Sequence, residues 1–189
     1  LTMKARGYNR TFFRGKTDEN GEKIAIEPRV YVVEESNEVN RNHLKYFGTD
    51  LNDVEKNNAT NQIDSLLNCL KDAKEYGSIL DIGQYDWKLL EIFAKKYDVD
   101  EQISFDTYGI DNTKKQLNKL IKQGCVMSDK YWVVSTNPPY MGLKSGMTGK
   151  LVEKVKKDYS DSKSDMYAVF IEKCVNISKK HGLISMVTQ

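Results

Sequence analysis

The pattern of apolar and polar positions is clearest after residue 130, where it predicts a strand, a helix and a second strand. Residues 131–136, Tyr-Trp-Val-Val-Ser-Thr, form a short β-branched run typical of a buried strand. Apolar residues then recur at helical spacing over residues 165–180, after Ser164 as a cap and before Gly182 as a stop, and residues 183–187 are apolar again. This succession predicts a βαβ unit with parallel strands and a right-handed crossover. The buried face of its helix is expected to consist of Tyr167, Phe170, Ile171, Cys174 and Ile177.

Helical spacing dominates the middle of the chain. Helices are predicted over residues 40–47, 62–76, 86–97 and 113–123, with a further short helix over residues 148–157. Gly77 and Gly124 stand where the second and the fourth of these helices should end. The polar residues 52–61 are expected to include a loop.

The first part of the chain shows weaker signals. Residues 1–8 resemble the end of a helix that has no cap signal at its start, and residues 17–21 predict a loop or a hairpin turn. A strand is predicted over residues 29–34, because valines favour extended backbone. Residues 35–37, Glu-Ser-Asn, follow as the strand end and a helix cap.

Composition narrows the class of protein. The 189 residues suit one domain, and a net charge of +2 gives no strong field for nucleic acid over the whole chain. The three cysteines are scattered without a C-x-x-C pair, and the two histidines are isolated, so neither a disulfide nor a metal site is expected. Free cysteines and the lack of a membrane-length apolar stretch or signal peptide predict a cytoplasmic protein.

Residues 137–140, Asn-Pro-Pro-Tyr, form the most distinctive local pattern of the chain. The two prolines fix φ, and the residue before a proline is held extended, so a stiff corner should follow the strand over residues 131–136. Open α/β sheets bind ligands at this end of their strands. Asn137 and the carbonyl of Pro138 could accept the two hydrogens of a nucleobase amine, and Tyr140 could stack on the base. The alternative is a structural turn with a packed tyrosine.

Longer stretches around this corner resemble one known family. Residues 137–142 and 159–170, together with residues 3–6, 34–37 and 72–78, are similar to the adenine-specific DNA methyltransferases of bacterial BREX phage-resistance systems. The resemblance implies an α/β, partial Rossmann-like methyltransferase fold with a helical insertion, and S-adenosyl-L-methionine as cofactor. It implies that Asn137, Pro138, Pro139 and Tyr140 are catalytic. Glu35 and Asn37 would lie near the adenosine part of the cofactor, although a plain helix cap explains them equally well.

The same resemblance implies double-stranded DNA as the partner, together with other phage-defence proteins, and neither a membrane nor a metal. Lys144, Lys150 and Lys154 follow the corner and could contact DNA phosphates. An exposed basic helix face is the alternative interpretation.

A methyl donor needs a glycine-rich turn between a strand and a helix, and the sequence does not show a convincing one. Residues 80–84, Leu-Asp-Ile-Gly-Gln, imitate only its start, and residues 108–111 resemble only weakly a ribose-binding strand. In the related enzymes the turn precedes the residues that match 3–6. We therefore expect a fragment of a larger methyltransferase in which the first strands are missing. Its parts would be residues 1–37, a mainly helical insertion over 38–128, and a catalytic βαβ unit over 129–189.

Three functions are compatible with these patterns. The first is methylation of adenine N6 in DNA after base flipping, in phage defence or restriction-modification, by the complete enzyme; the fragment alone would be inactive. The second is methylation of a protein glutamine at N5, because those enzymes share the Asn-Pro-Pro-Tyr corner. The third is a DNA-recognition module that keeps the corner without turnover.

Overall fold

A computed structural model describes residues 16–17, 19–21, 23–24, 30–98 and 107–187, and divides the chain into two units, Leu1–Val32 and Val33–Gln189. In the first unit, β1 (Lys16–Thr17) pairs antiparallel with β2 (Lys23–Ile24). Gly21, with φ of 82°, lies in the turn between them, so the predicted hairpin is confirmed. The predicted helix end over residues 1–8 lies outside the described residues.

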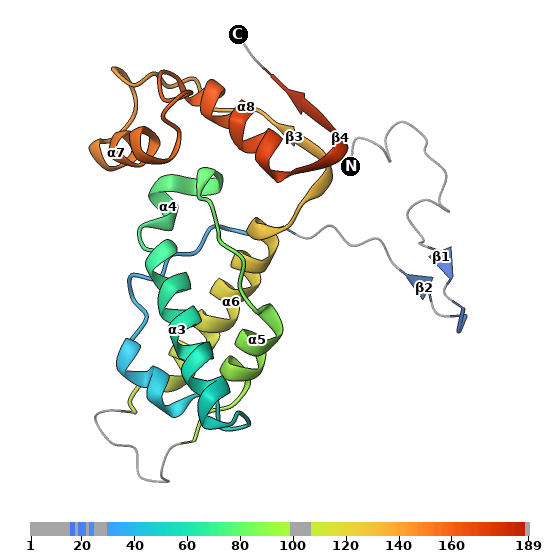
Figure 1. Ribbon diagram of the computed structural model, residues 1–189, viewed down its shortest axis with the longest axis vertical. Helices are drawn as coiled ribbons and strands as arrows, with labels where there is room; N and C mark the ends of the chain where they lie inside the picture. Colours follow the sequence, from blue (N-terminus) through green and yellow to red (C-terminus); the bar gives the residue numbers. More distant parts are fainter. Residues whose placement is uncertain (1–15, 18, 22, 25–29, 99–106, 188–189) are drawn as a thin grey trace. The chain divides into compact units, whose positions relative to one another are not determined.

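The second unit contains a helical part followed by the predicted strand–helix–strand part (Figure 1). The helical part comprises η1 (Arg41–Tyr46), α3 (Asp53–Cys69), α4 (Ala73–Tyr76), η2 (Gly77–Ile79), α5 (Trp87–Lys95) and α6 (Ile110–Ser128). The remaining elements are β3 (Tyr131–Thr136), α7 (Gly149–Asp158), α8 (Met166–Ile177) and β4 (Ser178–Met186). Within the described ranges, no helix combines the length and apolar character that crossing a bilayer requires.

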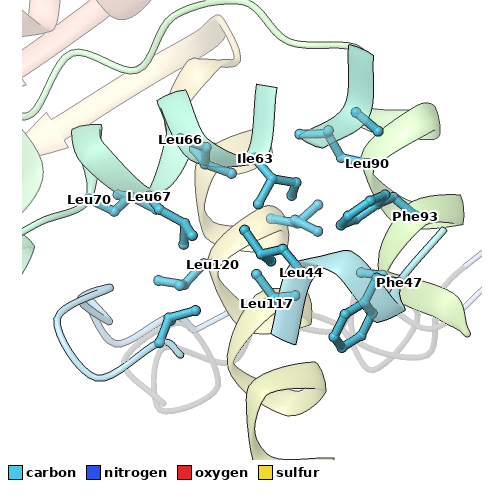
Figure 2. Packing of buried hydrophobic residues seen from close by; sticks show 14 of the residues in the cluster. Leu44, Phe47, Ile63, Leu66, Leu67, Leu70, Leu90, Phe93, Leu117 and Leu120 are labelled. Carbon is cyan, nitrogen blue, oxygen red and sulfur yellow. The ribbon is translucent and has the colours of Figure 1, made fainter. Parts of the chain in front are cut away.

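One apolar cluster holds the helical part together. Figure 2 shows side chains of α3, α5 and α6 pointing toward one another and toward Leu44 and Phe47. Phe47 stacks on Phe93 with ring centroids 6.1 Å apart. Most of these side chains are almost fully buried, and burying a Leu or Phe side chain stabilises the folded state by about 1.5–3 kcal/mol. The apolar spacing that predicted these helices is therefore the spacing of a shared core.

The helix around residue 63 begins earlier than predicted and ends earlier too. The polar residues 52–61, expected to include a loop, form the first half of α3. A capping box explains this start, because the Asn52 side chain accepts from the Glu55 backbone and the Glu55 side chain accepts from the Asn52 backbone. α3 ends at Cys69, and Asp72 adopts a left-handed φ of 55° before α4. Gly77 ends α4, as predicted.

Gly124 does not end a helix, which corrects the prediction for residues 113–123. It lies inside α6, which continues to Ser128. A Cβ atom at this position would lie 2.9 Å from Cη2 of Trp87 and 3.0 Å from Cδ1 of Leu66. The glycine therefore lets α6 approach α3 and the indole that opens α5, which is a tertiary requirement rather than a local stop.

The strand predicted over residues 29–34 is wrong in its described part, because residues 30–34 have no regular structure; residue 29 lies outside the described residues. The backbone of Glu34 forms its hydrogen bonds with the side-chain amide of Gln123 on α6, and not with a neighbouring strand. Its Oε1 accepts from the Glu34 N–H at 2.6 Å, and its Nε2 donates to the Glu34 carbonyl at 3.0 Å. Val30 and Val32 are exposed. Their preference for extended backbone is not matched by a pairing partner among the described residues.

The predicted parallel pairing is confirmed, because β3 and β4 pair in parallel and α8 lies between them in the sequence. α8 ends at Ile177, before the predicted residue 180, and β4 begins at once with Ser178 opposite Tyr131. The next paired residues are Val133 and Leu183, so residues 179–182 of β4 face Trp132 alone. Gly182 thus lies inside this bulge instead of ending the helix.

The buried face of α8 is rotated from the predicted one. Met166, Val169, Lys173 and Cys174 are buried, whereas Ile171 is exposed. Lys173 is buried because its ammonium group has partners, donating to the Leu80 carbonyl at 2.7 Å and to Asp81 Oδ1 at 3.3 Å. Burial lowers the pKa of Lys173, and Asp81 partly offsets that effect. A second small core, formed with α7, packs against this face.

Candidate active site

The corner after β3 keeps its polar and aromatic groups open to solvent. Pro138 is buried, while Asn137 and Pro139 on either side of it are exposed. The Tyr140 side chain is 53% exposed, so its ring is not wedged into the interior. The Met141 N–H donates to the Pro139 carbonyl at 3.0 Å, which tightens the turn. One proline therefore anchors the corner while its neighbours face outward.

Backbone hydrogen bonds fix this corner to the start of α8. The Met166 N–H donates to the Met141 carbonyl at 2.9 Å, and the Leu143 N–H donates to the Ser164 carbonyl at 3.1 Å. Asp165 is the N-cap of α8, and its side chain accepts from the Tyr167 N–H at 3.2 Å. The sequence had predicted Ser164 as the cap of this helix, so that prediction is wrong by one residue. Strand end, corner and helix start therefore form one connected piece.

The corner offers acceptors that the rest of the described chain does not use. Among the described residues, none hydrogen-bonds the side-chain amide of Asn137 or the hydroxyl of Tyr140. An open amide oxygen next to a fixed carbonyl can accept hydrogen bonds from an amine. An exposed aromatic ring nearby can stack on a planar group.

The two residues predicted near the cofactor, Glu35 and Asn37, make different contacts. Glu35 lines a pocket of about 160 Å³ and forms an ion pair with Lys74 at 3.6 Å. Asn37 is engaged with Asp72, since its Nδ2 donates to Asp72 Oδ1 at 3.0 Å and its Oδ1 accepts from the Asp72 N–H at 2.9 Å. The Asn37 amide thus holds the turn between α3 and α4, while the carboxylate of Glu35 faces a cavity.

The three lysines predicted to contact DNA differ in their surroundings. Lys144 is exposed in the turn after the corner. Lys150 forms an ion pair with Asp72 at 3.2 Å, and hydrogen bonding to that carboxylate raises the pKa of the Lys150 ammonium. Lys154 pairs with Asp158 at 2.7 Å and lies over the Tyr76 ring. The Lys150 side chain is 63% exposed, so its ion pair costs little to open. The side chains of Lys154 and Asp158 are only 25% and 24% exposed.

The segment that imitates a donor-binding turn is held by the βαβ part instead. Residues 80–86 have no regular structure. Lys173 binds Leu80 and Asp81, and the buried Tyr159 hydroxyl donates to the Ile79 carbonyl, where burial raises the pKa of the phenol. Asp111, in the segment that resembled a ribose-binding strand, lies in the first turn of α6 and accepts from the Tyr97 hydroxyl at 2.8 Å. Neither segment shows the strand-to-helix turn of a donor site.

Lys173 was missed as a contact residue in the sequence, although one signal was available. It lies four residues after Val169, in phase with Met166 on the apolar face of α8. A lysine in such a position needs a partner, since an unpaired buried ammonium is costly. No group of three or more His, Cys, Asp or Glu side chains in the described part is placed to hold a metal ion.

The chain is a mixed α/β protein with a parallel strand pair and a connecting helix. Its candidate ligand site is the open corner at the end of β3. Comparison with protein families identifies it further. The family described as Eco57I restriction-modification methylase matches residues 29–189, so the chain belongs to this family of methylases.

Two relatives support the resemblance to adenine-specific methyltransferases. The chain is 36% identical over 119 residues to the adenine-specific methyltransferase PglX of Lacticaseibacillus casei (strain Zhang), which covers 61% of this chain and 10% of that protein. It is 31% identical over 122 residues to the adenine-specific methyltransferase BrxX of Escherichia coli O9:H4 (strain HS), covering 61% and 9%. The matched part spans about a tenth of the length of these relatives. The resemblance predicted from the sequence is confirmed.

Proposed function

We propose that this chain carries the catalytic corner of a DNA adenine N6-methyltransferase that acts in phage defence or restriction-modification. The observation that carries the proposal is the open Asn137 amide beside the half-exposed Tyr140 ring, on a corner tied to the start of α8. Membership of the methylase family and the names of the two relatives give the reaction class.

The chemistry follows from the poor nucleophilicity of a nucleobase amine. Its lone pair is delocalised into the ring, and hydrogen bonds from both amine hydrogens favour a pyramidal nitrogen whose lone pair is available. Asn137 Oδ1 and the Pro138 carbonyl accept these hydrogens, while Tyr140 stacks on the flipped base. The new N–C bond would form as the methyl–sulfur bond of the sulfonium donor breaks, leaving a neutral thioether. The methylated amine would then be a cation and lose one proton to solvent. The two acceptor oxygens stabilise the positive charge that develops before that loss.

S-adenosyl-L-methionine supplies the methyl group when bound. Within the described residues only Glu35 among the predicted cofactor contacts faces a cavity, and Asn37 is occupied by Asp72. We therefore assign no donor-binding role to Asn37. A carboxylate such as that of Glu35 suits a hydroxyl or amine donor of the cofactor.

Duplex DNA is the proposed substrate, with Lys144 as a phosphate contact. Lys150 and Lys154 would be further contacts once their ion pairs with Asp72 and Asp158 open. Other phage-defence proteins are the proposed assembly partners. These contacts position the duplex without reading its sequence.

Asn137→Ala in the complete protein tests the proposal. Removing one preorganised hydrogen-bonding group from a reaction centre typically lowers kcat about 10²–10³-fold, and we expect a loss of methylation of this order with DNA affinity retained. Asn57→Ala, the same change on the exposed face of α3, is the matched control and should leave methylation unchanged. Full methylation by Asn137→Ala would refute the catalytic role.

The same assay separates the other functions. A glutamine N5-methyltransferase would modify a protein substrate and leave DNA unmethylated. A recognition module would protect against phage equally well with Asn137 or Ala at this position, whereas the enzyme loses methylation and defence together. Titration calorimetry of this chain with S-adenosyl-L-methionine tests the predicted lack of a donor site, and tight stoichiometric binding would contradict it.

A further inference from the structure

A tryptophan lies exposed at the end of β3 that is remote from the catalytic corner. The Trp132 side chain is 62% exposed, although large aromatic residues are usually well buried. The Lys179 ammonium lies over its ring, 5.3 Å from the centroid. This cation–π contact joins a residue of β3 to the bulge of β4.

Further lysines lie close to Trp132 and Lys179 in the sequence. Lys130 precedes β3, and Lys180 and His181 follow Lys179 in β4; all three are exposed. The ammonium of Lys130 donates to the Asn176 carbonyl at the end of α8. The one acidic neighbour in sequence, Asp129, accepts from the Lys130 backbone N–H at 2.7 Å. We call Lys130, Trp132, Lys179, Lys180 and His181 the Trp132 patch.

The backbone beneath the Trp132 patch is a built feature of the sheet. Residues 179–182 are inserted opposite Trp132, and His181 adopts a left-handed φ of 65°. Gly182 lies so close to β3 that a Cβ atom would be 3.2 Å from the carbonyl oxygens of both Tyr131 and Trp132. The bulge is thus pressed against β3, and it places the Lys179 ammonium over the indole.

An indole among lysines suits one kind of ligand. Lysines alone bind any polyanion, whereas an exposed aromatic ring adds stacking with an unpaired nucleobase, which duplex DNA does not offer. We infer that the Trp132 patch binds single-stranded nucleic acid, with one base stacked on Trp132 and adjacent phosphates on Lys179, Lys180 and Lys130. Lys179, which covers the ring in the free protein, moves to a phosphate when the base stacks.

This surface is separate from the catalytic corner. Trp132 and Asn137 are five residues apart along an extended strand, which corresponds to roughly 16 Å. The corner would take a base flipped from a duplex, and the Trp132 patch would hold an unpaired strand elsewhere. Binding at the patch needs no methyl transfer, so it can fail while the proposed enzyme function holds, and the reverse is also true.

Tryptophan fluorescence reads this site directly. The chain has two tryptophans, and Trp87 is partly buried with its ring centroid 5.3 Å from that of Tyr85. In the Trp87→Phe variant, Trp132 is the only tryptophan, so selective excitation of tryptophan reports on Trp132. Titration of this variant with single-stranded oligothymidine should give saturable quenching, and a duplex of the same length should quench much less.

Variants separate stacking from charge. Trp132→Leu should weaken binding to labelled oligothymidine about 5- to 150-fold, the range for losing one stacked base, and Trp132→Phe should restore part of the loss. Lys179→Gln with Lys180→Gln should reduce the salt dependence of log K by about 1.4, at 0.7 per lost contact. Lys156→Gln with Lys157→Gln on α7 removes the same charge elsewhere and should leave the Trp132 signal unchanged.

Several results would overturn the inference. Unchanged affinity in Trp132→Leu, or equal quenching by heparin, would reduce the patch to a nonspecific charged surface. Equally strong binding to vesicles of anionic lipid would point to a membrane surface instead. Unfolding curves of each variant show whether it is folded. If Trp132→Leu does not fold, the variant with Lys179→Gln and Lys180→Gln takes its place in the oligothymidine binding assay.

Discussion

Gly182 gives the sharpest test of how β3 and β4 fit together. A Cβ atom at this position would lie 2.9 Å from the Lys179 carbonyl oxygen and 3.2 Å from those of Tyr131 and Trp132. Ordinary contacts between carbon and a carbonyl oxygen are about 3.3–3.6 Å long. All three obstructing atoms belong to the backbone, so no side chain can rotate away to relieve the contact. Gly182→Ala therefore requires β3 and the bulge to separate.

The expected cost is that of overpacking a well-packed site, about 1–3 kcal/mol of unfolding free energy. For a chain of this size, 1 kcal/mol corresponds to about 2–4 °C in Tm. We therefore expect the Tm of Gly182→Ala to fall by about 2–12 °C.

Thermal and urea unfolding followed by circular dichroism measure this effect. Gly149→Ala is the control, because Gly149 begins α7 and its Cβ would meet nothing within 4 Å. That change should leave stability equal or raise it by up to about 1 kcal/mol, since alanine restricts the unfolded chain. If Gly182→Ala unfolds at the same temperature as Gly149→Ala, the close approach between β4 and β3 is wrong.

Two other substitutions test different parts of the chain. Gly124→Ala should lower the unfolding free energy, measured in urea titrations, by about 1 kcal/mol net. Crowding of the new methyl group against Trp87 and Leu66 outweighs the gain of about 1 kcal/mol in helix propensity. A stabilised variant would contradict the tight packing of α6. A hydrogen bond from Asn37, and to a smaller extent one from Lys150, holds the pKa of the Asp72 carboxyl below its usual range. The ionised carboxylate therefore stabilises the folded state above about pH 4, and this stabilisation is lost as the pH falls through the folded-state pKa. The difference in stability between wild type and Asp72→Asn should therefore shrink toward low pH in unfolding curves, and a difference independent of pH would exclude this linkage.

Local sequence signals predicted several elements well. β3 has the predicted bounds, and the predicted helix starts at residues 86 and 148 are the N-caps of α5 and α7. Each of these signals acts over a few residues, through apolar spacing or a side chain that binds a nearby N–H group. The two prolines likewise make the corner at Asn137 a local property, and its exposure agrees with that expectation. The start of α3 was missed although its capping box is local too.

The remaining errors have a different cause, which is contact with distant residues. Residues 30–34 do not form a strand, and the Glu34 backbone is instead hydrogen-bonded by the side chain of Gln123, 89 positions away. Gly124 serves the packing of α6 against α3 and Trp87, although a glycine at that spacing also suits a helix end. α8 stops at Ile177 because the next residue pairs with Tyr131.

The amino-acid sequence alone therefore determined the periodic elements, the proline corner and the resemblance to adenine-specific methyltransferases, because all of these depend on neighbouring residues. Tertiary structure decided which glycines mark close packing, and why Lys173 is buried on α8 with the Leu80 carbonyl as its partner. It also decided that a bulge of β4 places Lys179 over Trp132. A buried polar group or a close backbone approach is stable only with its partner in place, and that partner is supplied by the fold.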